Sequence, residues 1–206
     1  MSSYTYEAKD AKTSLETYEW DNVWFEHTED ITTLRVMYIG DSISCATRRV
    51  ATEVSERKIL FDGFGTSKGL DNPYFKDSLR IFAKQQRSRN AIIINNGLHG
   101  WHLNDTTEYA AEYEKMILFL IKEFEDTPLY VVLTTHISDK ARDERVKVRN
   151  EVVKKLAEKY SLEVIDLYSP VLEHPELISG DGVHLISDGY KILAKTIVEK
   201  LSSNIL

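Results

Sequence analysis

The stretch LRVMYIGDSIS, residues 34–44, runs from a mostly apolar segment of strand length directly into a polar turn. Its apolar part is nearly continuous rather than alternating, which is typical of a strand that is covered on both faces of a sheet. Four further runs of this kind follow, at residues 59–61, 91–94, 129–133 and 162–167. The sequence therefore predicts five buried strands.

Helical patterns separate these runs. Tyr109, Tyr113 and Met116 repeat at intervals of four and three residues, the spacing of one helix face. A similar stripe begins at Val148, and the last one begins at Tyr190. Strands that alternate with helices in this way predict a single α/β domain, in which a parallel sheet lies between two layers of helices.

Size and charge limit the class of protein. The chain has 206 residues, enough for one core, and a formal net charge of -7. We expect no binding to nucleic acid, because phosphate recognition needs clustered Lys and Arg, and no attachment to an anionic membrane. The single cysteine, Cys45, excludes an internal disulfide and fits a reducing compartment.

Residues 1–33 lie outside the strand–helix alternation, and we interpret them as an N-terminal extension that packs on a domain of residues 34–206. Trp20 and Trp24 are spaced to share one helix face, which would pack against that domain. No cationic start followed by an apolar run is visible, so we expect a cytoplasmic protein. Secretion with a signal peptide already removed stays open as the alternative.

Ligands of parallel α/β sheets bind beyond the carboxyl ends of the strands. Ser42 stands at the first of these ends, where it could cap a helix or present its hydroxyl as a nucleophile. Asp181 and His184 follow the fifth strand, in a pattern that is common by chance when it stands alone. Together they supply the base that a weak hydroxyl nucleophile needs and the acceptor that orients this base. The three residues predict a catalytic triad on one edge of the sheet.

Four short elements stand at these strand ends: GDSIS (40–44), a glycine-bearing loop (62–71), GLHG (97–100) and DGVH (181–184). In this order they resemble the blocks of the SGNH, or GDSL, hydrolase superfamily, over roughly residues 34–203. The resemblance implies a three-layer α/β/α sandwich with a flavodoxin-like, five-stranded parallel sheet of strand order 2-1-3-4-5. It also implies ester hydrolysis without a metal or other cofactor, with Ser42 as nucleophile, His184 as base and Asp181 as the residue that orients it.

The resemblance further implies an oxyanion hole made by the serine N–H, a glycine N–H of the second block and an asparagine side chain of the third. Gly69 is the preferred donor of the second block, with Gly65 and the Ser67 backbone as alternatives. In the third block His99 stands where the family has asparagine, and the family's aspartate is missing. A neutral histidine also offers one N–H donor, so His99 is expected to take this task.

The other polar and aromatic residues behind the strands are candidates for the substrate cleft. These are Asp41, Asn95, Asn96, Trp101, His102 and His136. Either asparagine could also replace His99 as the oxyanion donor. Four histidines follow strands, but no H-E-x-x-H or comparable spacing occurs, so we expect no metal.

We therefore expect a serine esterase that hydrolyses small acyl esters through an acyl-enzyme, with carbohydrate O-acetyl esters as the favoured substrate class. An acyltransferase on the same fold is the first alternative, which would differ by excluding water and binding an acceptor alcohol. A non-catalytic, flavodoxin-like domain could hold a phosphate at the GDSIS turn, but it would leave Asp181 and His184 without a role. A pseudo-enzyme that binds an ester or sugar without turnover is a further alternative.

Overall fold

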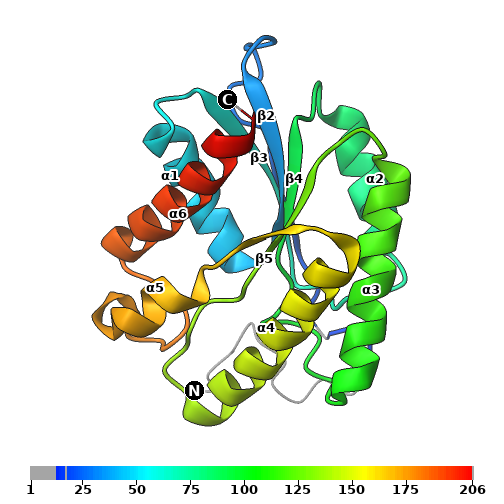
Figure 1. The fold of residues 1–206 in the computed structure, drawn as a ribbon, viewed down its shortest axis with the longest axis vertical. Helices are drawn as coiled ribbons and strands as arrows, with labels where there is room; N and C mark the ends of the chain where they lie inside the picture. The colour runs from blue at the N-terminus through cyan, green and yellow to red at the C-terminus, as the bar shows by residue number, and fades with distance from the viewer. Residues whose placement is uncertain (1–12, 17, 206) are drawn as a thin grey trace.

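The computed structural model describes residues 13–16 and 18–205 of the chain. Within these ranges the chain forms one sheet with helices on both of its faces (Figure 1). Residues 1–12 lie outside the description, and with them most of the sequence on which the expectation about a signal peptide rests.

The sheet of the described chain has six strands in the order β1-β3-β2-β4-β5-β6. The strands are β1 (Asp21–Trp24), β2 (Leu34–Gly40), β3 (Ile59–Thr66), β4 (Ala91–Ile94), β5 (Leu129–Val132) and β6 (Glu163–Ile165). All strands from β2 to β6 run parallel to their neighbours in this group. The strand order 2-1-3-4-5 that the resemblance implied is therefore confirmed for the five strands expected from the sequence.

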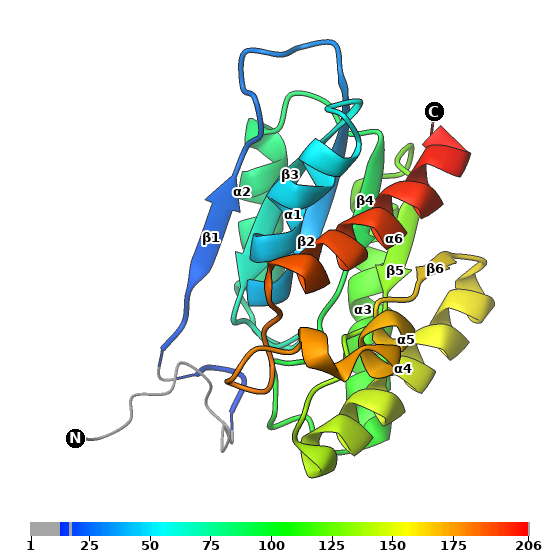
Figure 2. The ribbon, with the colours of Figure 1, turned by 90° about the vertical axis from the view of Figure 1, so that its left-hand side faces the viewer.

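One strand, β1, has no counterpart among these expectations. It pairs antiparallel with β3 at the edge of the sheet (Figure 2). The expectation that Trp20 and Trp24 share a helix face is wrong, because Trp24 ends β1 and Trp20 precedes it. A spacing of four residues also places two side chains on one face of a strand, so the spacing alone could not decide. The pairing occupies backbone groups that β3 would otherwise leave open at the edge.

Two layers of helices enclose the sheet. The helices are α1 (Ser42–Val54), α2 (Phe75–Gln85), α3 (Thr106–Glu123), α4 (Lys140–Tyr160), α5 (Tyr168–Glu173), the 3-10 turn η1 (Pro175–Leu177) and α6 (Ser187–Ile205). Val36 and Tyr38 of β2 join the core under α1 and α6, whereas Met37 and Ile39 join the core under α2, α3 and α4. None of the described helices combines the length and the apolar character that crossing a membrane requires.

The buried ion pair between Arg35 and Asp62 connects the turn before β2 to the sheet. The Arg35 guanidinium lies 2.8 Å from Asp62 Oδ1, and the two side chains are 3% and 0% exposed. Arg35 also donates to the carbonyl oxygens of Glu26, His27 and Asp30. Each charge of the pair therefore has hydrogen-bond partners, as buried charges require.

We expect Arg35→Met to lower the free energy of unfolding by about 3–5 kcal/mol, because Asp62 would stay buried without its cation. The matched control is Arg57→Met, which breaks an exposed pair with Glu53 and should cost no more than about 1 kcal/mol. Urea unfolding of both variants measures the two losses. Equal losses would contradict the assignment of this pair as a determinant of stability.

Candidate active site

Ser42 is the first residue of α1, directly beyond the carboxyl end of β2. Asp41 caps this helix, and its Oδ1 accepts a hydrogen bond from the Ile43 N–H at 2.9 Å. Asp41 is not among the described residues that line the pocket next to Ser42, so its expected place in the cleft stays a prediction. The turn is also tight: a Cβ on Gly40 would lie 2.7 Å from the Ser44 Cβ, so a residue without a side chain suits this position.

Two hydrogen bonds join Ser42, His184 and Asp181. His184 Nε2 lies 2.7 Å from Ser42 Oγ, and His184 Nδ1 lies 2.6 Å from Asp181 Oδ2. An ionised carboxylate only accepts hydrogen bonds, which places the imidazole proton on Nδ1 and leaves Nε2 to accept from the serine hydroxyl. The structure thus brings together the three residues that the sequence predicted as a triad.

The loop before α6 positions Asp181 and His184. Asp181 Oδ1 accepts from the backbone N–H groups of Val183 and His184, at 2.9 Å each, and from the Ser179 hydroxyl. Gly182 has a φ of +78°, in the left-handed region that favours glycine. Burial opposes the charge of Asp181, but the hydrogen bonds from Val183 and His184 outweigh it and hold the pKa of this carboxyl well below its usual range. At neutral pH Asp181 is therefore an acceptor for the His184 ring.

Ser42 and His184 open onto a pocket of about 480 Å³. The described residues that line it are Tyr18, Trp20, Asp21, Asn22, Ser42, His99 and His184. Four of these seven come from β1 and the residues directly before it, a part of the chain for which the sequence indicated only packing. That segment carries no motif and lies outside the strand–helix alternation, so the aromatic character of Trp20 was the one signal available.

His99 reaches this pocket from the loop after β4. Its side chain is 7% exposed, and its Nδ1 lies 3.4 Å from Oε1 of Glu16, whose side chain is 3% exposed. The ring of Trp20 meets the ring of His99 edge-on, with centroids 6.0 Å apart. The structure therefore places His99 in the same pocket as Ser42, as expected, and adds a carboxylate partner that the sequence did not reveal.

The loop after β3 was expected to supply a second oxyanion donor. The Ser67 N–H donates to the Trp20 carbonyl oxygen at 3.1 Å, and Gly65 lies within β3, paired on both sides, so neither alternative to Gly69 is supported. Gly69 packs closely on Gly100, where a Cβ on Gly69 would lie 3.0 Å from the Gly100 Cα. Gly69 is not among the described residues that line the pocket, and the role of its N–H stays a prediction.

Arg149 of α4 holds the irregular loop after β4. Its guanidinium donates to four carbonyl oxygens at 2.8–3.1 Å, those of Gly97, His99, Gly100 and Leu103. Burial lowers the pKa of Arg149, but a guanidinium remains charged at neutral pH. The four carbonyl groups therefore solvate a buried cation, and this cation in turn fixes the backbone that carries His99.

Trp101 is not among the described residues that line the pocket, so its expected place in the cleft is not supported. Its side chain is buried, and the guanidinium carbons of Arg142, Arg145 and Arg149 lie 4.8, 4.6 and 5.4 Å from its ring centroid. Contacts of this kind stabilise a cation over an aromatic face. Trp101 therefore anchors the loop against α4 instead of contacting a ligand.

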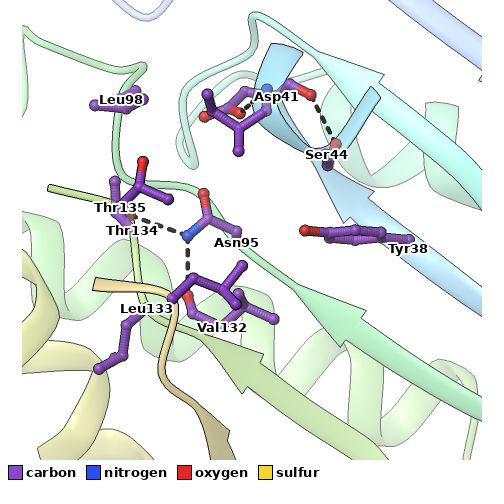
Figure 3. A pocket seen from close by; sticks show the side chains of 11 residues that line it. Tyr38, Asp41, Ser44, Asn95, Leu98, Val132, Leu133, Thr134 and Thr135 are labelled. Carbon is purple, nitrogen blue, oxygen red and sulfur yellow. Dashed lines mark hydrogen bonds between the residues drawn. The ribbon is translucent and has the colours of Figure 1, made fainter. Parts of the chain in front are cut away.

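Asn95 and Asn96 are not among the described residues that line the pocket either, so their expected place in the cleft is not supported. Asn95 Nδ2 donates to the Val132 carbonyl oxygen at 2.9 Å and to Thr134 Oγ1 at 3.0 Å (Figure 3). Asn96 Nδ2 donates to the Lys68 carbonyl oxygen at 2.9 Å. Both amides tie neighbouring strand ends together, so neither is supported as the third oxyanion donor.

Two other histidines expected in the cleft have separate partners. His102 Nε2 lies 2.8 Å from both carboxylate oxygens of Asp71. His136 Nδ1 lies 2.8 Å from Asp143 Oδ1, and Asp143 Oδ2 accepts from the Tyr168 hydroxyl at 2.8 Å. Neither histidine is among the described residues that line the pocket next to Ser42, so this pocket does not support their expected place in the cleft.

The described residues contain no group of three His, Cys, Asp or Glu side chains that could hold a metal ion. The four histidines that follow strands face carboxylates one by one: His99 faces Glu16, His102 faces Asp71, His136 faces Asp143 and His184 faces Asp181. Burial raises the pKa of the Cys45 thiol, which keeps it protonated and a poor nucleophile at neutral pH.

Comparison with known proteins adds one curated relative. The chain is 24% identical over 172 residues to "Putative peptidoglycan O-acetyltransferase YrhL" of Bacillus subtilis (strain 168). The alignment covers 84% of this chain and 24% of that protein, so the chain spans about a quarter of the length of this relative. No protein-family model matches the chain.

Solved structures share the fold. An acetyl xylan esterase, AlAXEase, superposes with a TM-score of 0.66 at 18% identity, over 82% of this chain and 100% of that one. A GDSL-like lipase from Bacteroides thetaiotaomicron VPI-5482 superposes with a TM-score of 0.65 at 15% identity, over 82% of this chain and 88% of that one. The chain therefore has the fold of the SGNH/GDSL hydrolases.

We expect the Asp181 carboxyl to titrate below the ordinary value for aspartate, about 3.9, because its hydrogen bonds favour the ionised form. A lowered pKa in the folded state adds stability that is present above the ordinary value and is lost as the pH falls further. Carbon-13 NMR of the Asp181 side chain measures the midpoint, and His184→Ala should raise it by removing one donor. A midpoint at or above the ordinary value would contradict this account.

Proposed function

We propose that the protein is a serine esterase that hydrolyses small acyl esters, with O-acetyl groups on carbohydrates as its substrate class. The observation that carries the proposal is the pair of hydrogen bonds from Ser42 to His184 and from His184 to Asp181, of 2.7 and 2.6 Å, at the floor of an open pocket. A hydroxyl, a base and an orienting acid in this arrangement are what acyl transfer through a serine requires.

The geometry supports a two-step mechanism. Ser42 Oγ attacks the ester carbonyl carbon while His184 Nε2 takes the hydroxyl proton, and Asp181 stabilises the imidazolium that forms. When the tetrahedral intermediate collapses, the alcohol leaves with the proton held by His184, and the acyl group stays on Ser42. Water, deprotonated by the same His184, then attacks the acyl-enzyme. When this second intermediate collapses, the acid is released and His184 returns the proton to Ser42 Oγ.

The negative oxygen of the tetrahedral intermediate needs donors that are fixed before the reaction starts. The Ser42 N–H lies at the N-terminus of α1, where the first helical N–H groups have no partner within the helix. His99 faces the same pocket, and Gly69 lies on the loop next to it. We assign these three residues to the oxyanion hole, with His99 as the side-chain donor.

The pocket suits a polar, ring-shaped alcohol. Tyr18 and Trp20 supply aromatic surface, and Asp21 and Asn22 supply hydrogen-bonding groups on the same wall. A sugar presents apolar C–H faces and hydroxyl groups together, so a wall of this composition matches it. The acetyl xylan esterase of the same fold is named for an acetylated carbohydrate, which supports this substrate class.

An acyltransferase is the second candidate, favoured by the O-acetyltransferase name of the curated relative. The first step would be the same, but the hydroxyl of a second carbohydrate would replace water in the second. Product analysis with an acetyl donor and a sugar acceptor separates the two: free acetate marks hydrolysis, and an acetylated acceptor marks transfer.

Ser42 should be the residue that a fluorophosphonate modifies, and Ser42→Ala should abolish turnover of a chromogenic acetate ester, because no other hydroxyl is bonded to His184 among the described residues. Ser44→Ala is the matched control. The Ser44 hydroxyl donates to the Asp41 carbonyl, away from the histidine, so labelling should persist. A chelator should leave the rate unchanged. Labelling at Ser44 or Cys45 with Ser42 untouched would refute the assignment.

His99→Ala should lower kcat by a factor of about 10²–10³ and change KM much less, because the bond to the oxyanion matures only in the transition state. His99→Asn should recover part of the loss, since the amide is also a donor. The control His136→Ala removes a histidine that is likewise held by a carboxylate but lies outside the pocket, and it should keep kcat near normal. Steady-state kinetics test these expectations, and a near-normal kcat for His99→Ala would contradict them.

A further inference from the structure

We infer that Glu16, in the segment before β1, is a positioning residue that keeps His99 doubly protonated and so makes it a cationic oxyanion donor. The inference rests on the proposed function, in which His99 faces the developing negative charge. It assigns a task to a part of the chain that precedes every motif of the active site.

Burial is the first argument. The side chains of Glu16 and His99 are 3% and 7% exposed, and Glu16 Oε1 lies 3.4 Å from His99 Nδ1. Glu16 Oε2 is buried and has no hydrogen-bond partner among the described residues. A buried carboxylate is stable only when a positive group or several donors compensate it. The ring of His99 is the one titratable base of the described chain that contacts this carboxylate.

The second argument is the tautomer. A carboxylate beside Nδ1 draws a proton to that nitrogen, as it does for His184. If the His99 ring carried this proton alone, Nε2 would present a lone pair and would repel an oxyanion. A second proton makes Nε2 a donor and leaves the Glu16–His99 pair neutral overall, which a buried site tolerates better than a net charge.

The pocket therefore holds two carboxylate–histidine pairs in different environments. The side chains of His184 and Asp181 are 38% and 51% exposed, and Nε2 of His184 faces a hydroxyl that must give up its proton. This ring must be neutral at the start of the reaction. The buried His99 ring faces the site where negative charge develops. Environments that separate the protonation states of similar groups are how one site obtains both a base and a cation.

Other charged or titratable groups surround the buried pair. Glu19 accepts from the Glu16 N–H at 2.9 Å and from Ser67 Oγ at 3.2 Å, which ties the segment to the loop after β3. Arg149 donates to the His99 carbonyl oxygen at 2.8 Å. Further titratable groups of the described residues line the pocket or lie beside it, among them Tyr18, Asp21, Asp181 and His184.

A double-mutant cycle separates positioning from folding. Glu16→Gln should lower kcat by about 10–100-fold, a usual range for loss of a residue that orients a functional ligand, with KM changed less than about threefold. In the His99→Asn background the same change should cost less than about twofold, because an amide donor needs no extra proton. The matched control Glu19→Gln removes a neighbouring acid that does not contact His99, and its effect should be equal in both backgrounds. An equal loss for Glu16→Gln in both backgrounds would overturn the inference.

Nitrogen-15 NMR of the histidine rings gives a readout that does not depend on turnover. In the wild-type protein both His99 ring nitrogens should be protonated, and Glu16→Gln should leave one of them unprotonated. A wild-type His99 ring with one unprotonated nitrogen would overturn the inference. If the wild-type protein neither turns over an acetate ester nor labels at Ser42, the proposed function fails, and the NMR result still decides the protonation of His99.

Discussion

Parallel pairing of β2 with both β3 and β4 is the constraint on which the candidate site depends. Gly40 pairs with Gly65 and Ile39 pairs with Ile94, so the three strands end almost level. The turns that leave them must therefore meet at one edge, with Ser42 in the middle position. A slip of one residue in either pairing would turn the side chains of a whole strand to the opposite face and displace the loop behind it. The register of these three buried strands thus determines where the loops of the candidate site lie relative to Ser42.

Strand register alone does not fix the loop after β4, which has no regular structure and therefore leaves carbonyl groups that need partners. Arg149 of α4 supplies these partners, although it lies 46 to 52 residues further along the chain than the carbonyl groups that it binds. The contact stabilises both partners: the carbonyl groups of the loop solvate the buried guanidinium, and the guanidinium orders the loop. The position of His99 consequently depends on the contact between the loop after β4 and Arg149 of α4, and it cannot be predicted from the loop sequence alone.

The sequence predicted the five parallel strands and the triad because both depend on local patterns, although only one of the three residues of β6 is buried. Strands covered on both faces appear as apolar runs, and a parallel sheet brings their ends together. The sequence did not predict β1, because three of the four residues of this edge strand are exposed and form no apolar run. The sequence did not predict the structural role of Asn95, because its hydrogen-bond partners Val132 and Thr134 lie 37 and 39 residues away. A side chain whose direction depends on a distant partner gives the same local signal whether it binds substrate or backbone.

Hydrolysis and transfer differ in this site only by what attacks the acyl-enzyme. The side chains of His184 and Asp181 are 38% and 51% exposed, which gives water the access to the base that hydrolysis requires. The aromatic wall formed by Tyr18 and Trp20 would instead favour transfer to a second alcohol. By microscopic reversibility, a surface that binds the sugar as leaving group also binds it as acceptor. The longer this wall holds an alcohol near acylated Ser42, the more often that alcohol attacks before water does. Under the proposed function, the segment before β1 would therefore influence the ratio of the two products, although it contains none of the residues that break the ester bond.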